Sequence, residues 1–341
     1  MKALSSIAPI EMAHGAGGKT SRRLIENVIL PAFANPALEA LSDAAILTIG
    51  GMRLATTADG FVVKPLQFPG GSIGTLAVHG TVNDLAVSGA RPLALLATMI
   101  LEAGLPGNIL QREIEAMAEA CRHAGVQIVG GDTKVVEHGM ADGMYISTFG
   151  IGIVDERLTL SAHAVRPGDR VLLSGAIGDH GITILLARGE LDLESNVRSD
   201  TRPLTPFVDA LCERAAPGLR WMRDPTRGGV ATSLNELARE AGIAVALNEH
   251  AIPVHDDVRG ACEILGLDPL HIANEGQLIA IVAPEYAEEA IAALQSVAGG
   301  EEACVIGEIR ETPVATVLTE TSYGGSRVVD TLVGDPLPRI C

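Results

Sequence analysis

The chain has 341 residues, a length typical of two packed domains. Hydrophobic residues make up 47% and charged residues 20% of it, which excludes a disordered or fibrous protein. Aromatic residues contribute only 3%, and Asp plus Glu outnumber Lys plus Arg by 42 to 25, giving a net charge of -17. Because such a surface repels a phosphate backbone and offers few stacking rings, we expect no nucleic-acid binding.

The sequence has no pattern typical of an export signal or a membrane span. The apolar stretch near the N-terminus, Ala3–Ile10, is short and broken by Pro9. The longest apolar run, Pro92–Leu101, is far shorter than the ~18 residues that suggest a membrane helix. Five scattered cysteines without a C-x-x-C pair disfavour a disulfide framework and a zinc site. We therefore expect a cytoplasmic protein with no membrane partner.

Apolar runs bounded by glycine alternate with amphipathic stretches along the chain, which predicts an α/β or α+β fold. In the first half we expect strands over 46–49, 53–58, 93–101, 126–129 and 144–154, and helices over 75–88 and 108–123. In the second half we expect strands over 170–173, 243–247, 278–283 and 303–309, and helices over 180–188, 203–215, 227–240 and 285–297. The paired glycines between the first two strands predict a tight hairpin.

A turn sequence, Pro167-Gly168-Asp169, follows the first half of the chain. We place a domain boundary near residue 160, between a domain of residues 1–160 and a domain of residues 161–331. Residues 332–341 contain two prolines, so we predict a flexible tail without regular structure. Fully extended, ten residues reach about 33 Å.

A glycine-rich segment at residues 14–20 precedes an expected helix. The backbone N–H groups of Gly15, Gly17 and Gly18 are suited to face a phosphate there. The segment resembles the end of a P-loop, but Ala13 stands where that motif requires glycine. By itself it fits a flexible loop equally well.

Several aspartates stand at presumed strand ends or turns: Asp59, Asp84 and Asp132, with Asp43 as a further candidate. Mg²⁺ prefers oxygen ligands and is usually held by a few carboxylates together with nucleotide phosphates. Aspartates that converge from different elements would suit it. Each one alone fits an ordinary turn, helix surface or loop better, and Gly130–Asp132 fits a loop after a strand.

Two further segments are candidates for chemistry. In Asp224–Gly229, Arg227 and the adjacent glycines at a helix start would form a phosphate or oxyanion site, with a simple helix cap as the alternative. Glu275 stands beside Gly276 and would serve as a general base if it were desolvated near substrate, whereas a solvated turn is the ordinary alternative.

The last residue, Cys341, places a thiol at the tip of the tail. Such a thiol could visit sites on two partners, as a carrier arm does. The α-carboxylate beside it opposes the thiolate, while Arg339 favours it. Without further context, an incidental terminal residue remains the more common interpretation.

Taken in order, these segments are similar to the HypE family of hydrogenase-maturation proteins. The family lies in the superfamily of aminoimidazole ribonucleotide synthetase, selenophosphate synthetase and thiamine-monophosphate kinase, which bind ATP without a P-loop. The motifs that carry the resemblance are 14–18, 68–74, 80–84, 130–134, 174–181, 224–229, 274–276 and the terminal Pro-Arg-Ile-Cys. The chain departs from the family at Ser72 and Lys64, where acidic residues are common.

The resemblance implies an N-terminal α/β domain whose strands close a β-barrel with a second subunit, making a homodimer, and a C-terminal α/β sandwich. It implies ATP and Mg²⁺ as cofactors. The implied nucleotide-binding residues are Gly15, Gly17, Gly18, Asp59, Gly71, Asn83, Asp84, Asp132, Thr133, Arg227 and Gly228. The implied metal ligands are Asp84, with Asp43, Asp59 and Asp132 as further candidates.

The resemblance also implies an activity. A carbamoyltransferase of the HypF family carbamoylates Cys341, and the chain then uses ATP to dehydrate the thiocarboxamide to a thiocyanate. Lys134 is the candidate for steadying the transferring phosphoryl group or the carbamoyl oxygen, and Glu275 is the candidate proton acceptor. The cyanide would pass to iron on a HypC–HypD complex for a [NiFe] hydrogenase. The alternatives are another ATP-using enzyme of the superfamily, making a purine intermediate, selenophosphate or a thiamine phosphate, and a non-enzymatic thiol carrier.

Overall fold

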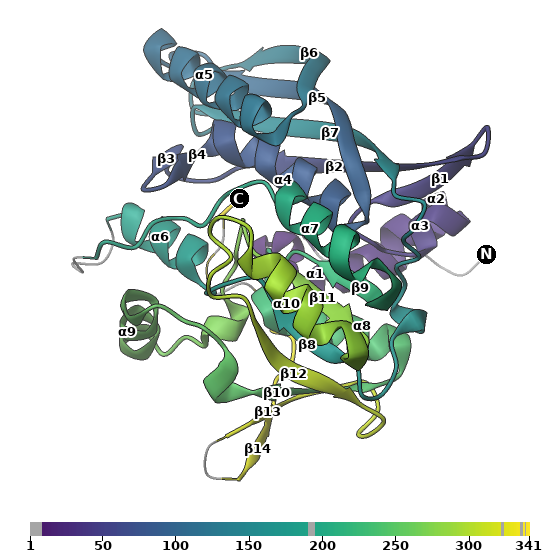
Figure 1. Ribbon diagram of the computed structural model, residues 1–341. Helices are drawn as coiled ribbons and strands as arrows, with labels where there is room; N and C mark the ends of the chain where they lie inside the picture. Colours follow the sequence, from purple (N-terminus) through teal and green to yellow (C-terminus); the bar gives the residue numbers. More distant parts are fainter. Residues whose placement is uncertain (1–8, 190–194, 322–323, 335–336, 338) are drawn as a thin grey trace.

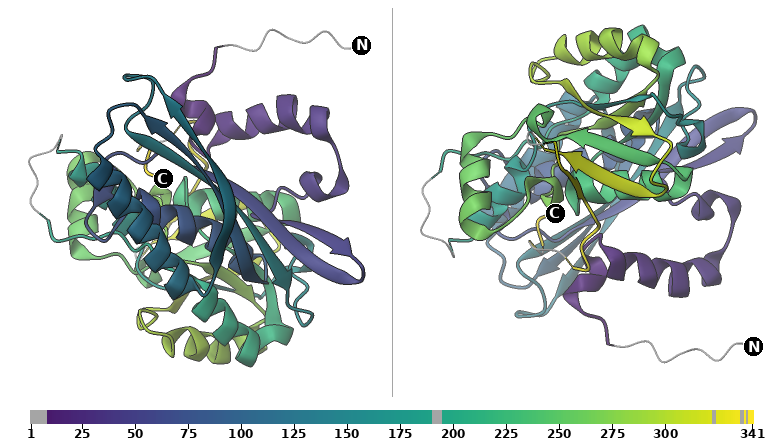
Figure 2. Two further views of the ribbon diagram at one scale, coloured as in Figure 1. Left: turned by 90° about the horizontal axis from the view of Figure 1, so that it is seen from above. Right: turned by 90° about the horizontal axis from the view of Figure 1, so that it is seen from below.

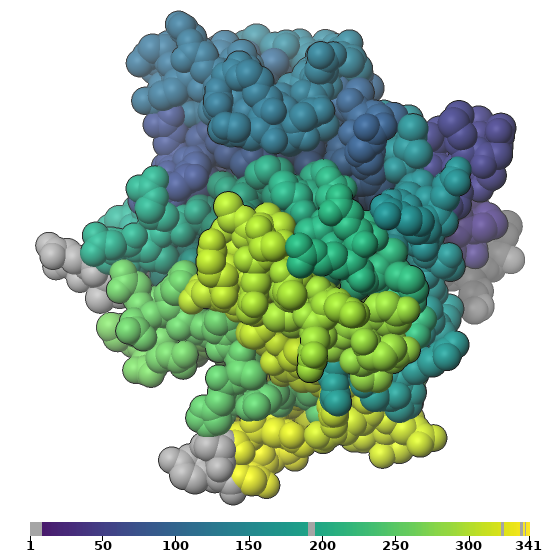
Figure 3. All heavy atoms as spheres, in the orientation of Figure 1, coloured from purple at the N-terminus to yellow at the C-terminus, as the bar shows by residue number. Residues whose placement is uncertain are grey.

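The computed structural model describes residues 9–189, 195–321, 324–334, 337 and 339–341. Each half of the chain builds one large sheet, and the two halves lie one above the other with the C-terminus between them (Figure 1). In the space-filling view, the first half of the chain lies above the second, and the two are in contact (Figure 3). The α/β fold predicted from the sequence is therefore confirmed.

The first sheet has the strand order β1-β2-β7-β5-β6. Its neighbouring strands are antiparallel except for β5 and β6, which are parallel. The elements of this half are β1 Ala45–Ile49, β2 Met52–Phe61, β3 Gln67–Phe68, β4 Gly71–Ser72, α4 Ile73–Val87, β5 Ala90–Glu102, α5 Gly107–Ala124, β6 Gln127–Val136 and β7 Met144–Val154. The predicted hairpin is confirmed: Ile49 pairs with Met52, and both intervening glycines have positive φ.

Helix α4 is the central element of the first half. Ser72 caps its start by accepting a hydrogen bond from the Thr75 backbone, and the helix packs on the sheet beneath α5. It is buried almost all round, because the second half covers the side that the sheet and α5 leave open. Its last turn consequently carries Asp84 into the contact between the two halves.

Strand β6 differs from the expectation. The sequence predicts a strand ending at 129 and a loop over 130–132, but the strand continues to Val136 in parallel register with β5. The pairing of β6 with β5 shifts register at Leu95/Leu96, next to the Gly130-Gly131 pair. Glycine is needed at position 131, because a Cβ there would overlap the Ala97 carbonyl. Asp132, Thr133 and Lys134 thus lie on a strand at the edge of the sheet.

The second sheet has the order β14-β13-β10-β12-β8-β11-β9, with β10 and β13 parallel and the other pairs antiparallel. Its half contains β8 Arg170–Leu173, α6 Asp179–Ala187, α7 Thr205–Ala215, β9 Leu219–Arg223, α8 Gly229–Ala241, β10 Ala244–Asn248, α9 Asp256–Leu265, β11 Ile279–Val282, α10 Ala287–Gln295, β12 Cys304–Arg310, β13 Thr316–Glu320 and β14 Ser326–Val328. The sequence analysis misses β9, α9, β13 and β14. The missed strands have at most five residues, too few for a clear alternation.

The first of the N-terminal helices contacts the second half of the chain, although it belongs to the first half of the sequence, while the third packs on β1. Helix α1 covers Lys19–Leu24, and α2 Leu30–Phe33 and α3 Pro36–Glu39 follow it along one side of the molecule (Figure 2). The Lys19 backbone N–H donates to the Leu332 carbonyl at 3.0 Å. Among the described residues, no helix is long and apolar enough to cross a membrane.

We expect Gly74→Ala to loosen the contact between α4 and α5. A Cβ at this position would press against the Glu113 carbonyl oxygen, which belongs to the backbone of α5 and cannot turn aside. Such overpacking lowers the free energy of unfolding by about 1–3 kcal/mol, measurable by urea denaturation. Gly107→Ala is the matched control, because its Cβ would meet open space. Equal stability of the two variants would contradict this packing.

Candidate active site

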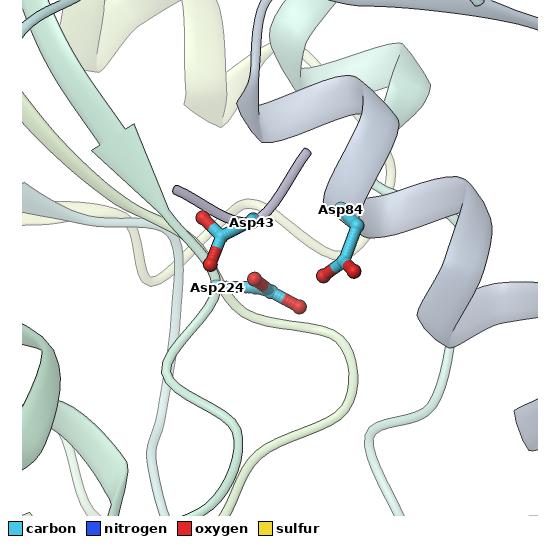
Figure 4. Close-up of side chains that lie close together, drawn as sticks. All are labelled: Asp43, Asp84 and Asp224. Atoms are coloured by element: carbon cyan, nitrogen blue, oxygen red, sulfur yellow. The ribbon is translucent and has the colours of Figure 1, made fainter. Parts of the chain in front are cut away.

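Three aspartates meet where the two halves of the chain face each other. Asp43 precedes β1, Asp84 lies in the last turn of α4, and Asp224 follows β9. One carboxylate oxygen from each lies within 4.8 Å of the other two, and Figure 4 shows the side chains pointing toward one another. Asp59, on β2, is close enough that its charge raises the pKa of Asp84. Of the aspartates that the sequence suggested, Asp43, Asp59 and Asp84 converge in the fold, whereas Asp132 lies on β6 and is not part of the cluster.

The cluster carries more negative charge than its neighbours offset. Arg223 lies beside it, with Nε at 3.2 Å from Asp43, and also pairs with Glu236. Burial first, and then the neighbouring aspartates, raise the pKa of Asp84 and that of Asp224 well above the ordinary range. A cation bound among these oxygens would remove that penalty. An all-oxygen donor set drawn from separate elements fits Mg²⁺.

A cavity of about 1000 Å³ opens onto the cluster. Gly17, Gly18 and Arg227 line it together with the aspartates Asp43, Asp59 and Asp84. Arg227 closes on the glycine loop by donating to the Gly15 carbonyl at 2.9 Å. Gly17 has φ +73°, and a Cβ there would clash with Arg227, so only glycine lets the loop lie this close. Gly228 has positive φ immediately before α8.

The end of the tail enters this region instead of extending into solvent. Leu337 and Ile340 are 3% and 2% exposed, which explains why a tail expected to be loose is packed here. The Val62 backbone N–H donates to an oxygen of the Cys341 α-carboxylate at 2.9 Å. Both views of Figure 2 place the C-terminus within the outline of the fold. Positions 335, 336 and 338, including both tail prolines, lie outside the described residues, as do residues 1–8.

Cys341 and Glu275 line the same small hollow. Its volume is about 40 Å³, and its other walls include Asp59, Asp224 and Arg227. Glu275 is 3% exposed, and burial, reinforced by Asp224 and Asp200, raises its pKa well above the ordinary range. The negative charge of Cys341 raises the pKa of Arg227. Glu275 is thus desolvated beside the tail, the condition that its predicted role as a base requires.

The remaining predicted site residues do not line the cavity or the hollow among the described parts of one chain. Lys134 lies on the edge strand β6, exposed and paired with Asp132 at 2.6 Å, and Thr133 is their neighbour. Gly71 is in β4. Asn83 is buried and holds backbone in place: its amide donates to the Glu275 carbonyl at 3.2 Å and its oxygen accepts from the Leu204 N–H at 2.8 Å.

The sequence analysis did not foresee three members of the charged cluster. It placed Asp224 in a phosphate-binding segment and not among the metal ligands, and it did not single out Arg223 or Glu236. The available signal was the succession of Arg223 and Asp224 before the Pro-Thr-Arg-Gly-Gly motif. The signal could be read only if Arg223 and Asp224 were known to end a strand, and the sequence analysis also missed that strand, β9.

Comparison with known proteins places this site in context. Models of the AIR synthase related protein N-terminal and C-terminal domains match residues 41–154 and 166–319. Carbamoyl dehydratase HypE of Azotobacter vinelandii is 50% identical over 332 residues, covering 97% of each chain. The chain belongs to the HypE family.

Solved structures of the family have the same fold. A HypE crystallised in complex with ATP is 45% identical, with a TM-score of 0.82 over 98% of this chain and 100% of that one. HypE in a HypE–HypF complex is 44% identical, with a TM-score of 0.86 over 91% of this chain and 99% of that one. The resemblance inferred from the motifs is confirmed.

The buried carboxylates predict an unusual pH dependence of stability. A carboxyl whose pKa is raised by folding binds its proton more tightly in the folded state, so stability rises as pH falls through that raised pKa. We therefore expect Asp84→Asn to be more stable than the original chain at pH 7.5 in EDTA. The advantage should shrink toward the ordinary carboxyl pKa of about 4. Urea denaturation at pH 7.5 and 5.5 measures it.

The exposed Glu263 on α9 provides a matched control for this experiment. Glu263→Gln should change stability equally little at both pH values. A loss of stability in Asp84→Asn that is the same at pH 7.5 and 5.5 would contradict the proposed charge excess.

Proposed function

We propose that this chain converts a thiocarboxamide on Cys341 to a thiocyanate at the expense of ATP. The observation that carries this proposal is the position of the tail: the terminal thiol shares a small hollow with Glu275 and Arg227, next to the aspartate cluster. A protein that only carried the group would not need a desolvated carboxyl beside the end of its tail. The relatives named as carbamoyl dehydratases favour this activity over the others of the superfamily.

The reaction balances as one phosphoryl transfer and one elimination. The carbamoyl oxygen attacks the γ-phosphorus of ATP and ADP leaves. The C–O bond then breaks, inorganic phosphate departs, and nitrogen loses both protons to give S–C≡N. Glu275 is the proposed acceptor of a nitrogen proton, since burial raises its pKa and so makes its carboxylate a stronger base. Arg227 offers positive charge beside the departing phosphate.

Asp43, Asp84 and Asp224 would hold Mg²⁺, with Asp59 next to them. When bound, the ion supplies positive charge that offsets the nucleotide phosphates. The glycine loop and Arg227 line the same cavity and are the proposed contacts of the nucleotide. Gly228 precedes α8, whose N-terminus would support the phosphates in the same way.

A homodimer would bring in the residues on β6. The strand is at the edge of its sheet with Val129 and Val135 exposed, and the open face beside it exposes Leu96, Phe149 and Ile151. Two such apolar faces would bury each other in a closed barrel. We propose that Asp132, Thr133 and Lys134 of one subunit thereby serve the site of the other, with Lys134 steadying the transferring phosphoryl group.

The cycle requires two partners. We propose that a carbamoyltransferase of the HypF family loads Cys341 and that a HypC–HypD complex accepts cyanide on its iron. A HypE has been crystallised with HypF, which supports the first contact. A thiol that carries a group between partners has to stay reduced, which a reducing compartment favours. This agrees with the cytoplasmic location expected from the sequence.

The direct test is the mass of the C-terminal peptide after carbamoylation by HypF and addition of Mg-ATP. We expect a loss of one water, about 18 Da, on Cys341, and none without ATP or in Cys341→Ala. Glu275→Gln and Lys134→Ala should accept the carbamoyl group but slow the water loss by about 10²–10⁴-fold, as removal of acid–base or charge-stabilising groups does. A carbamoyl group that persists in the original chain would favour the carrier alternative.

Metal binding provides a separate prediction. Asp224→Asn should weaken Mn²⁺ binding, measured by electron paramagnetic resonance of the unbound ion, by at least about tenfold, because the variant removes a charged ligand from the cluster. Asp209→Asn, on the exposed side of α7, is the control. Unchanged affinity in Asp224→Asn would place the ion elsewhere.

A further inference from the structure

Most of the hydrogen bonds that hold the end of the tail in place are made by its backbone. The Arg339 carbonyl accepts from Arg188 Nη2 at 3.0 Å and, more weakly, from the Lys64 N–H at 3.4 Å. The Ile340 carbonyl lies 2.8 Å from Nε2 of His180. These contacts surround the residues immediately before Cys341, so they determine where the thiol lies.

His180 is built to donate this hydrogen bond. It lies in the first turn of α6, is 0% exposed, and its ring packs edge-on against Phe68 with centroids 5.7 Å apart. Burial lowers its pKa, so the ring is neutral and one nitrogen carries the proton. The Ile340 carbonyl only accepts, which assigns that proton to Nε2. Nδ1 then accepts from the Ser199 hydroxyl at 2.8 Å.

The tail also makes an ion pair, which contributes less because water reaches it. Arg339 pairs with Asp142, but their side chains are 27% and 36% exposed, and ion pairs open to water stabilise little. The bond from His180 lies in the buried interior, where an unpaired carbonyl is costly. His180 should therefore contribute more to the docked position of the tail than Asp142 does.

We propose that His180 is a positioning residue that holds the Ile340 carbonyl and thereby sets the Cys341 thiol beside Glu275. Its catalytic consequence rests on the proposed dehydratase function, while the docking itself does not. Without the Nε2–H donor, the tail leaves the hollow more often. The docked fraction relative to the undocked one should fall about two- to tenfold, the effect of one buried neutral hydrogen bond.

Alkylation of Cys341 by iodoacetamide measures docking without any activity. The assembled protein is treated, and peptide mass spectrometry compares the rate at Cys341 with that at Cys304, a half-buried thiol in β12 that serves as internal reference. His180→Phe keeps a ring but removes the donor, and should raise the Cys341/Cys304 ratio two- to tenfold. His180→Gln places an amide N–H near Nε2 and should restore the original ratio. His250→Phe, at an exposed histidine, is the matched control.

An unchanged ratio in His180→Phe, or an equal rise in His180→Phe and His180→Gln, overturns the proposal. If His180→Phe also exposes the buried Cys212, the comparison passes to His180→Gln and His180→Asn. The shorter Asn amide does not reach Ile340, so equal ratios in those two variants overturn it as well.

Dehydration kinetics complete the test and separate the two proposals. In the donor-free variant, kcat of the preloaded protein should fall with the docked fraction, and so by no more than the factor by which the docked-to-undocked ratio falls, with KM for ATP unchanged. If the original chain loses no water but the alkylation ratios change as expected, the proposed function fails and the role of His180 stands. If water is lost normally while the ratios stay equal, the reverse holds.

Discussion

The fold brings three carboxylates of like charge together and removes them largely from water. Asp43, Asp84 and Asp224 come from three separate elements and converge where the two halves of the chain meet, against the repulsion that raises their pKa values. Arg223 lies among the carboxylates and offsets part of this charge. Hydrophobic packing of α4 against the first sheet and the second half supplies the free energy that keeps Asp84 in place. The electrostatic cost is thus carried by the fold, and the proposed Mg²⁺ would reduce it.

The tail is subject to a second constraint of the same kind. In the proposed reaction, its thiol has to be exposed to receive a group from a partner, and shielded from water while that group is activated. Leu337 and Ile340 favour the docked position by burying apolar surface, whereas the surrounding hydrogen bonds are few and mostly to backbone. Such contacts stabilise a defined geometry and still allow release, since each contributes only about 1 kcal/mol. A tail held by a large apolar interface would not leave.

The two proposed proton- and charge-handling groups reach the site by different routes. Glu275 is set by the hydrogen bonds of its own backbone, to the Asp200 carboxylate and the Asn83 amide. Lys134 lies on an exposed edge strand and would need the proposed second copy of the chain to approach the hollow. Assembly of the dimer would then be part of assembling the active site, which ties activity to oligomeric state.

The sequence by itself determined the alternation of strands and helices, the hairpin at Gly50-Gly51, the glycine-rich segment and the Arg227 segment as separate candidates, and, through its terminal motif, the family. These depend on local periodicity and on residue types with few physical uses. Only the tertiary structure decided that Asp224 joins Asp43 and Asp84, that Gly130–Lys134 continues a strand, and that the tail docks on His180. Each of these rests on contacts between residues far apart in the chain, and a spacing along the sequence carries no information about which distant atoms meet.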